Sequence, residues 1–259
     1  MSKRLADCAP DHVTHLIDEN RSLFNLRAGR IGGSSVYESE AISWVTTPGS
    51  AWPNSAFRPR LTEDNAGHVI DFWRTQAAAG LAPRRIVFAG SEPLERLLAR
   101  CGLKRTASNA AMYADLSRIA DPLGDSRSFR IVRVRDGAAF AEWVSVLGPA
   151  MFGRPVSRDA FAKIVSADDL RLFLGYAEGA PAATSLLFCS DGVASIHLVS
   201  TLEQFRGRGL GTMLTHAAAM AARDLGFEDV TLFASAMGES IYRRMGFVEC
   251  GRIAIYSLE

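Results

Sequence analysis

The chain has 259 residues, of which 48% are hydrophobic and 22% are charged, and its formal net charge is +1. These values are ordinary for a soluble globular protein with a buried core, and the length suits one large domain or two of about 130 residues. A net charge this close to zero gives no basic field for a nucleic-acid backbone, so we expect no nucleic-acid partner.

The cysteines and the N-terminal residues indicate which cellular compartment to expect. The four cysteines, at positions 8, 101, 189 and 250, are scattered and include no Cys-x-x-Cys pair. This spacing indicates neither a disulfide framework nor a metal site. The N-terminal residues lack the apolar core of a signal peptide, and no apolar run approaches the ~20 residues that span a bilayer. We therefore expect a cytoplasmic protein with reduced cysteines, no metal and no membrane association.

In the first half of the chain, the first segment with a clear pattern is an apolar and aromatic stretch at 42–57. We interpret this stretch as core, with the wall of a shared groove as the alternative. A helix is predicted at 62–81. Residues 95–117 then predict a short amphipathic helix, a Gly with a large apolar residue after it, and a final strand that contains a tyrosine. Polar residues with Pro and Gly follow, and they predict a linker at 119–127.

The second half has a clearer pattern. Its predicted strands and hairpin are 129–134, 171–192 with a turn at Glu178-Gly179, 193–201, 228–235 and 251–259. Its predicted helices are 136–148, 157–166, an Ala-rich segment at 211–226, and 238–246. Both halves end with a helix closed by Gly, a second short helix, another Gly and a tyrosine-containing strand. This similarity indicates a diverged repeat of domain size.

A Gly-rich and Arg-rich segment, QFRGRGLGTML, occupies 204–214 between a predicted strand and the Ala-rich helix. Glycines let the main chain approach an anion closely, and the N-terminus of the next helix adds unpaired N–H donors. Arg206 and Arg208 add forked, positively charged donors. The pattern matches neither a P-loop nor a dinucleotide-binding loop. It favours a phosphate-binding loop over a turn with solvated arginines.

Two segments resemble the signatures of the GNAT acetyltransferase superfamily. Residues 199–215 are similar to its acetyl-CoA signature, through Arg206, Gly209 and Gly211. The second signature is similar to 234–247, where its places are filled by Ser235, Gly238, Tyr242, Gly246 and Phe247. The resemblance covers roughly 127–259, and the element order of this half fits that fold.

The resemblance implies an α/β fold (an α+β mixed sheet) with two tandem GNAT-like domains, each a mostly antiparallel central sheet flanked by helices. Residues 1–120 would be a degenerate copy that lacks the cofactor loop, and 127–259 the catalytic acetyltransferase domain. Since tandem domains mimic a dimer, a monomer is expected.

The resemblance also implies a cofactor, acetyl-CoA, and its binding residues. The pyrophosphate would lie on the loop formed by Arg206, Gly207, Arg208, Gly209, Leu210, Gly211 and Thr212. The pantetheine arm would pair with the strand residues Leu198, Val199, Ser200 and Thr201. Ser235 stands where family members often have an Asn that contacts the arm, and its shorter side chain weakens that expectation.

The expected reaction is direct attack of a neutral amine on the thioester. The backbone amide of Val199 would hold the developing oxyanion. By resemblance, Tyr242 would give a proton to the leaving thiolate. His197 is the candidate base, since the ordinary pKa of histidine is ~6.5. Water relayed to a carboxylate or to a main-chain carbonyl is an equal alternative for the base, and Glu239 is a weaker one.

The first half lacks the same machinery. At the place of the loop, 57–69 has no Gly before Gly67, and Thr62 with two acidic residues after it indicates a capped helix start. Leu98 stands at the place of Tyr242. The first domain is therefore expected to be a structural or substrate-shaping partner.

The predicted function is that of an acetyl-CoA-dependent N-acetyltransferase acting on a small-molecule or peptide amine. The alternative is a non-catalytic acyl-CoA-binding regulatory module. The sequence leaves polyamines, amino acids, peptide N-termini and antibiotics open as acceptors, and the acyl group could be larger than acetyl.

Overall fold

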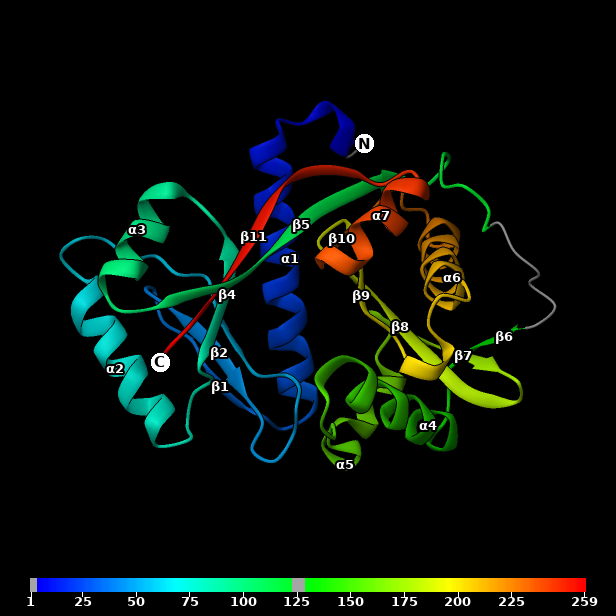
Figure 1. Ribbon diagram of the computed structural model, residues 1–259, viewed down its shortest axis with the longest axis horizontal. Coiled ribbons are helices and arrows are strands. Elements are labelled where there is room, and N and C mark those ends of the chain that lie inside the picture. The colour runs from blue at the N-terminus through cyan, green and yellow to red at the C-terminus, as the bar shows by residue number, and fades with distance from the viewer. Residues whose placement is uncertain (1–3, 123–128) are drawn as a thin grey trace.

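The computed structural model describes residues 4–122 and 129–259 (Figure 1). The predicted linker at 119–127 falls largely outside these residues, as does the start of the second predicted domain at 127; residues 119–122 form neither helix nor strand. Within the described ranges, no helix has both the length and the apolar character needed to cross a membrane.

The described chain is a mixed α/β fold in which one large, mostly antiparallel sheet is flanked by helices. The strands are β1 (Ser35–Tyr37), β2 (Ser43–Thr46), β3 (Ser55–Phe57), β4 (Arg85–Ala89), β5 (Lys104–Asp115), β6 (Phe129–Arg133), β7 (Leu170–Ala177), β8 (Ala180–Ser190), β9 (Val193–Thr201), β10 (Asp229–Ala234) and β11 (Val248–Ser257). The main helices are α1 (Pro10–Ile31), α2 (Ala66–Ala78), α3 (Glu92–Arg100), α4 (Gly137–Leu147), α5 (Arg158–Phe161), α6 (Leu210–Asp224) and α7 (Ala236–Arg244). The sheet order is β1-β2-β3-β4-β11-β5-β10-β9-β8-β7-β6.

The predicted elements of the second half are present, with ends that differ by a few residues. Local signals explain their positions: Asp136 and Ser157 cap α4 and α5 through their side chains, and Gly226 and Gly246 follow α6 and α7 with positive φ. The helix predicted at 157–166 is corrected, because α5 gives way to a 3-10 turn at Ala162–Ser166.

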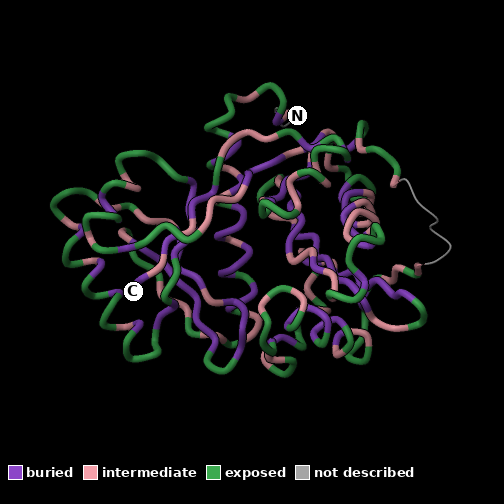
Figure 2. Tube along the Cα trace, in the orientation of Figure 1, coloured by how far each residue is buried: buried purple, intermediate pink, exposed green. Residues whose placement is uncertain are grey.

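Two corrections concern the first half. The helix predicted at 62–81 begins only at Ala66, because Thr62 and Asn65 exchange hydrogen bonds between side chain and backbone in a separate turn before it. The 22-residue helix α1 was not predicted, although it is the longest helix among the described residues. It runs through the centre of the molecule, and half of its residues are buried (Figures 1 and 2).

The two halves exchange their last strands. β5, from the first half, lies between β10 and β11, and β11, from the second half, lies between β4 and β5. Each sequence half therefore completes the part of the sheet that the other half builds. The result is one continuous sheet whose middle is made from the last strands of both halves.

Both halves also contain one short parallel strand pairing. β3 pairs with β4 only at Ala56 and Ile86, and β9 pairs with β10 only at Ser195 and Thr231. The strands diverge beyond these pairs. In the second half this divergence opens the edge of β9 toward the molecule's interior.

Helices cover both faces of the sheet. In the second half, α6 packs with β8 and β9 in one apolar cluster, and α4 packs in another on the opposite side, which Phe24 and Ala28 of α1 join. In the first half, α2 and α3 enclose a third cluster around Trp73. Val13, Ile17 and Leu26 of α1 also join two smaller clusters with strands of the first half, so α1 connects the cores of the two halves.

Candidate active site

The larger cavity lies where the two halves meet, with a volume of about 770 Å³. The predicted residues that line it are His197, Leu198, Val199, Ser200, Thr201, Arg206, Gly207, Gly209, Leu210, Gly211, Thr212, Ser235 and Tyr242. Arg208 is the predicted site residue that does not line it. Its guanidinium pairs with Glu178 at 2.7 Å, on the β7–β8 turn.

The Gly-rich loop has the shape of an anion cradle. Gly207 and Gly209 have φ values of 74° and 90°, and a Cβ added at either would meet no heavy atom within 4 Å. The first turn of α6 leaves N–H groups without helical partners. Among the described residues, Met213 is the first in α6 to donate to a backbone carbonyl, that of Gly209 (3.1 Å). The loop therefore offers free donors, open space and a helix N-terminus, which fit a pyrophosphate.

The edge of β9 that borders the cavity carries a bulge. The register with β8 shifts between Thr184 and Leu186, and Leu198 opposite them has a φ of 53°, in the left-handed region. The hydroxyl of Thr184 holds the bulge by donating to the Leu198 carbonyl (2.9 Å). Such a bulge redirects backbone groups, here beside the point where β9 leaves β10. Val199 follows directly, so its amide lies at the opening.

Tyr242 reaches the cavity from α7. Its ring lies close over Gly238, where an added Cβ would be 2.8 Å from the ring's Cε2. Burial raises the pKa of Tyr242 to about 12, while a hydrogen bond with Thr215 acts in the opposite direction. The phenol therefore keeps its proton across the physiological pH range and is a donor.

His197 lies on the side of β9 that faces α1. Its ring stacks on Phe24, with centroids 4.2 Å apart, and its Nε2 is 2.7 Å from the Ser195 hydroxyl. That hydroxyl donates to the Asn20 side-chain oxygen, so it accepts from His197 and places the proton on Nε2. Burial, followed by the charge of Arg21, lowers the pKa of His197 to about 3. The ring is neutral at neutral pH.

Glu239, the weaker candidate for the base, does not line the cavity. Its carboxylate pairs with Arg252 at 2.6 Å and lies 3.7 Å from Arg243. Within residues 4–122 and 129–259, no group of three or more His, Cys, Asp or Glu side chains could hold a metal ion.

The first half supplies a wall of the cavity that the sequence did not specify. The contributing residues include Arg21 and Phe24 of α1, Trp52 and Ser55 around β3, and Arg85 of β4. Within the stretch at 42–57, Ile42 and Trp44 are core, while Trp52 lines the cavity. From the second half, the segment Ala150–Phe152 after α4 also lines this cavity. No local motif marks these positions, because only the strand exchange and α1 bring them to β9.

The corresponding positions of the first half differ in character. Leu98, at the place of Tyr242, is fully buried in the cluster around Trp73. The turn before α2 is closed by the Thr62–Asn65 hydrogen bonds, and Thr62 also accepts the Ala66 N–H through its carbonyl. Side-chain oxygens therefore already accept hydrogen bonds from the Thr62 and Asn65 N–H groups. At the Gly-rich loop, the equivalent N–H groups are left for a ligand.

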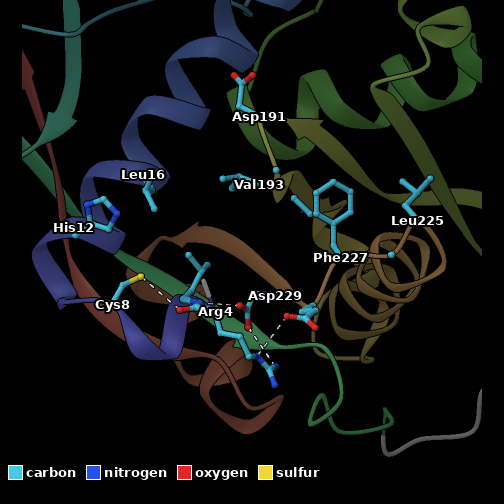
Figure 3. Close-up of a pocket in the computed structure, with 14 residues that line it drawn as sticks. Arg4, Cys8, His12, Leu16, Asp191, Val193, Leu225, Phe227 and Asp229 are labelled. Carbon is cyan, nitrogen blue, oxygen red and sulfur yellow. Dashed lines mark hydrogen bonds and ion pairs between the residues drawn. The ribbon is translucent and has the colours of Figure 1, made fainter. Parts of the chain in front are cut away.

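A smaller cavity of about 540 Å³ lies near the N-terminus (Figure 3). Arg4 reaches from it to Asp115 at 2.8 Å and to Asp229 at 3.7 Å, and His12 and Leu16 of α1 form part of its wall. None of the predicted site residues lines it. The features that the sequence predicted as functional therefore gather in the larger cavity.

Comparison with known proteins gives a family and a fold. A model described as an acetyltransferase (GNAT) domain matches residues 110–244. No curated protein matches the chain. A GCN5-related N-acetyltransferase from Kribbella flavida is similar in structure, with a TM-score of 0.69 and 17% identity over 92% of this chain and 94% of that one.

Two further solved structures show the same fold. One is a GCN5-related N-acetyltransferase from Sphaerobacter thermophilus, with a TM-score of 0.57 and 16% identity over 97% of this chain and 94% of that one. The other is a tandem GNAT protein from the clavulanic acid biosynthesis pathway, with a TM-score of 0.56 and 14% identity over 84% of this chain and 78% of that one.

Proposed function

The chain belongs to the GNAT acetyltransferase family, and on that premise we propose that it is an N-acetyltransferase that transfers an acetyl group from acetyl-CoA to a primary amine in a ternary complex. One observation carries the proposal: a single cavity brings together the Gly-rich loop, the free edge of β9 and the half-buried side chain of Tyr242. These features come from three separate segments of the second half.

The loop and the strand edge suit the two ends of acetyl-CoA. Gly207, Gly209 and the first turn of α6 offer backbone donors to the pyrophosphate, and the guanidinium of Arg206 lies beside them, anchored on the Thr201 carbonyl (3.2 Å). The edge of β9 from Leu198 to Thr201 offers backbone pairing to the pantetheine amides. Ser235, at the start of α7, is exposed on the same cavity.

Acetyl-CoA supplies the thioester whose carbonyl the amine attacks. The Val199 amide stabilises negative charge on the carbonyl oxygen, at the bulge that exposes it. Tyr242 holds the proton that the sulfur needs. Since the pKa of Tyr242 is about 12 and that of a thiol is ~8.5, full transfer costs about 5 kcal/mol. A barrier of roughly 16 kcal/mol, which corresponds to turnover near 10 s⁻¹, accommodates this cost.

His197 remains our candidate for the base, with a specific restriction. A ring whose pKa is about 3 does not retain a proton at neutral pH, so it must pass the proton on as it receives it. The Nδ1 atom carries the free lone pair, because Nε2 donates to Ser195. Water relayed to a main-chain carbonyl is the competing base.

We also propose that the first half is a diverged copy of the second that has lost the cofactor loop. Both halves have three strands, a helix, a strand, a helix and a strand in the same order, and both have a single parallel pair at the same place. The similarity to a tandem GNAT protein supports this arrangement. The copy would act as the second wall of one active site, in a monomer.

The test is thiol release from acetyl-CoA with a broad panel of amines, run beside calorimetric binding of acetyl-CoA. The proposal expects binding, release with at least one amine, and an N-acetylated product by mass spectrometry. Binding without release for any amine would instead identify a non-catalytic acyl-CoA-binding module. Absence of binding would contradict both.

A further inference from the structure

The cavity is lined by four arginines, Arg21, Arg85, Arg206 and Arg244, and by no Asp or Glu among the described residues. Arg206 and Arg244 belong to the loop and to the end of α7, where a phosphate-rich molecule such as CoA accounts for positive charge. Arg21 and Arg85 belong to the first half, away from the loop. Their charge needs a separate explanation.

Arg21 is already paired with a carboxylate, that of Asp18. Its guanidinium donates to one Asp18 oxygen through Nε (3.2 Å) and Nη2 (2.7 Å), and Nη2 also donates to the Val87 carbonyl (2.6 Å). The other Asp18 oxygen accepts the Ala89 N–H (2.9 Å). The pair is buried and joins α1 to β4, so its role is structural.

Arg85 is different. Its Nε donates to the Asn54 carbonyl (3.2 Å), which orients the guanidinium, and no carboxylate of the described residues pairs with it. On β4 it shares a face with Val87, which also lines the cavity, and its side chain is accessible. The two terminal nitrogens are left to form a fork, which matches a carboxylate or phosphate.

The surroundings of Arg85 favour an anion. Desolvation, and then the charges of Arg21 and Arg154, lower the pKa of Arg85, so the folded protein holds this positive charge at a cost. An anionic ligand would offset that cost, whereas a polycation would increase it. The nearby apolar wall of Phe24 and Trp52 gives the remainder of a ligand a place to pack.

Resting on the proposed function, we infer that the acceptor is a primary amine that also carries a carboxylate or phosphate, and that Arg85 binds this anion. Arg85 is then a specificity-determining residue supplied by the first half. Amino acids become favoured acceptors among those that the sequence left open, and polyamines and polycationic antibiotics become disfavoured.

Calorimetric binding to the CoA-bound protein tests the inference without turnover. The ligands are matched pairs: a panel of α-amino acids against their carboxamides, and O-phosphoethanolamine against ethanolamine. The variants are Arg85→Gln and Arg85→Glu, with Arg84→Gln as the control. Arg84 donates to the backbone carbonyl of Glu259 and does not line the cavity. The two sets of pairs distinguish a carboxylate from a phosphate.

The wild type and the Arg84 control are expected to bind at least one anionic member about 10- to 100-fold more tightly than its neutral partner, the range for a lost charge-assisted contact. Arg85→Gln is expected to remove the preference, and Arg85→Glu to reverse it toward cationic amines, which misfolding would not produce. Equal binding within every pair, or a preference that survives Arg85→Gln, overturns the inference. Thiol release with neutral amines alone would do so while leaving the acetyltransferase proposal intact.

Discussion

His197 is a buried, neutral imidazole, and its burial makes the free energy of unfolding depend on pH. Its pKa is about 3 in the folded protein and ~6.5 in the unfolded chain, so the unfolded state binds a proton first as the pH falls. Above pH ~6.5, the contribution of the neutral ring to the free energy of unfolding has its full value. Below that pH, the contribution decreases by about 1.4 kcal/mol per pH unit.

The prediction is that His197→Gln flattens the fall in unfolding free energy between pH 6 and pH 4, measured by urea denaturation. His15→Gln is the control, since His15 is exposed on α1. Equal slopes in the wild type and His197→Gln would show that the ring is not held neutral.

At the residue scale, the sequence was informative where function depends on a local motif. Tyr242 and the glycines of the loop lie at the cavity because their spacing along one chain segment sets their geometry. Arg208 was predicted with them, but its guanidinium pairs with Glu178 and does not line the cavity. The positions of Arg85 and Phe24 in the cavity could not be predicted, because no local sequence pattern indicates that β4 and α1 lie at the same cavity as β9.

At the scale of elements, the glycines that flank α6 allow a matched comparison of two substitutions. Gly209 precedes the helix with a φ of 90°, and Gly226 follows it with a φ of 88°. Ala at either position costs about 1–2 kcal/mol of stability, because a Cβ is unfavourable in the left-handed region. Only Gly209 borders the space assigned to the pyrophosphate.

Gly209→Ala is therefore expected to lower both Tm and acetyl-CoA affinity, the latter by about tenfold or more, while Gly226→Ala lowers Tm alone. Thermal unfolding and calorimetry measure the two effects. An equal loss of affinity in both variants would mean that the loop acts only through helix stability.

The elements that the sequence predicted and those that it missed differ in how they are buried. β7 and β8 are buried along most of their length and read as apolar runs that end at turns, and α6 has a buried stripe, so their sequence pattern marks them. α1 is enclosed by both halves, and its buried residues include Asn20, Arg21, Ser22 and Asn25. A helix that buries polar groups in this way carries no simple apolar stripe, and the pattern could not reveal it.

At the scale of the whole molecule, the exchange of β5 and β11 couples the halves. Without the first half, β10 loses its antiparallel neighbour β5 along Asp229–Ala234, and β11 loses both of its partners, β4 and β5. The sequence placed both strands at the ends of their halves but contained no signal for which half each one joins.

The prediction is that residues 127–259 expressed alone are insoluble or unfolded, and that they copurify as a folded complex when coexpressed with residues 1–120. Circular dichroism and size-exclusion chromatography measure this. A folded, monomeric 127–259 fragment would show that the exchanged strands are dispensable.

The central claim is that this cavity transfers an acetyl group with Tyr242 as the proton donor. The most direct measurement compares the wild type with Tyr242→Phe for acetyl-CoA affinity and for thiol release with an accepted amine. We expect an unchanged Kd and a kcat lower by about 10²- to 10⁴-fold, the usual contribution of a general acid. Wild-type turnover in Tyr242→Phe with every accepted amine would contradict it.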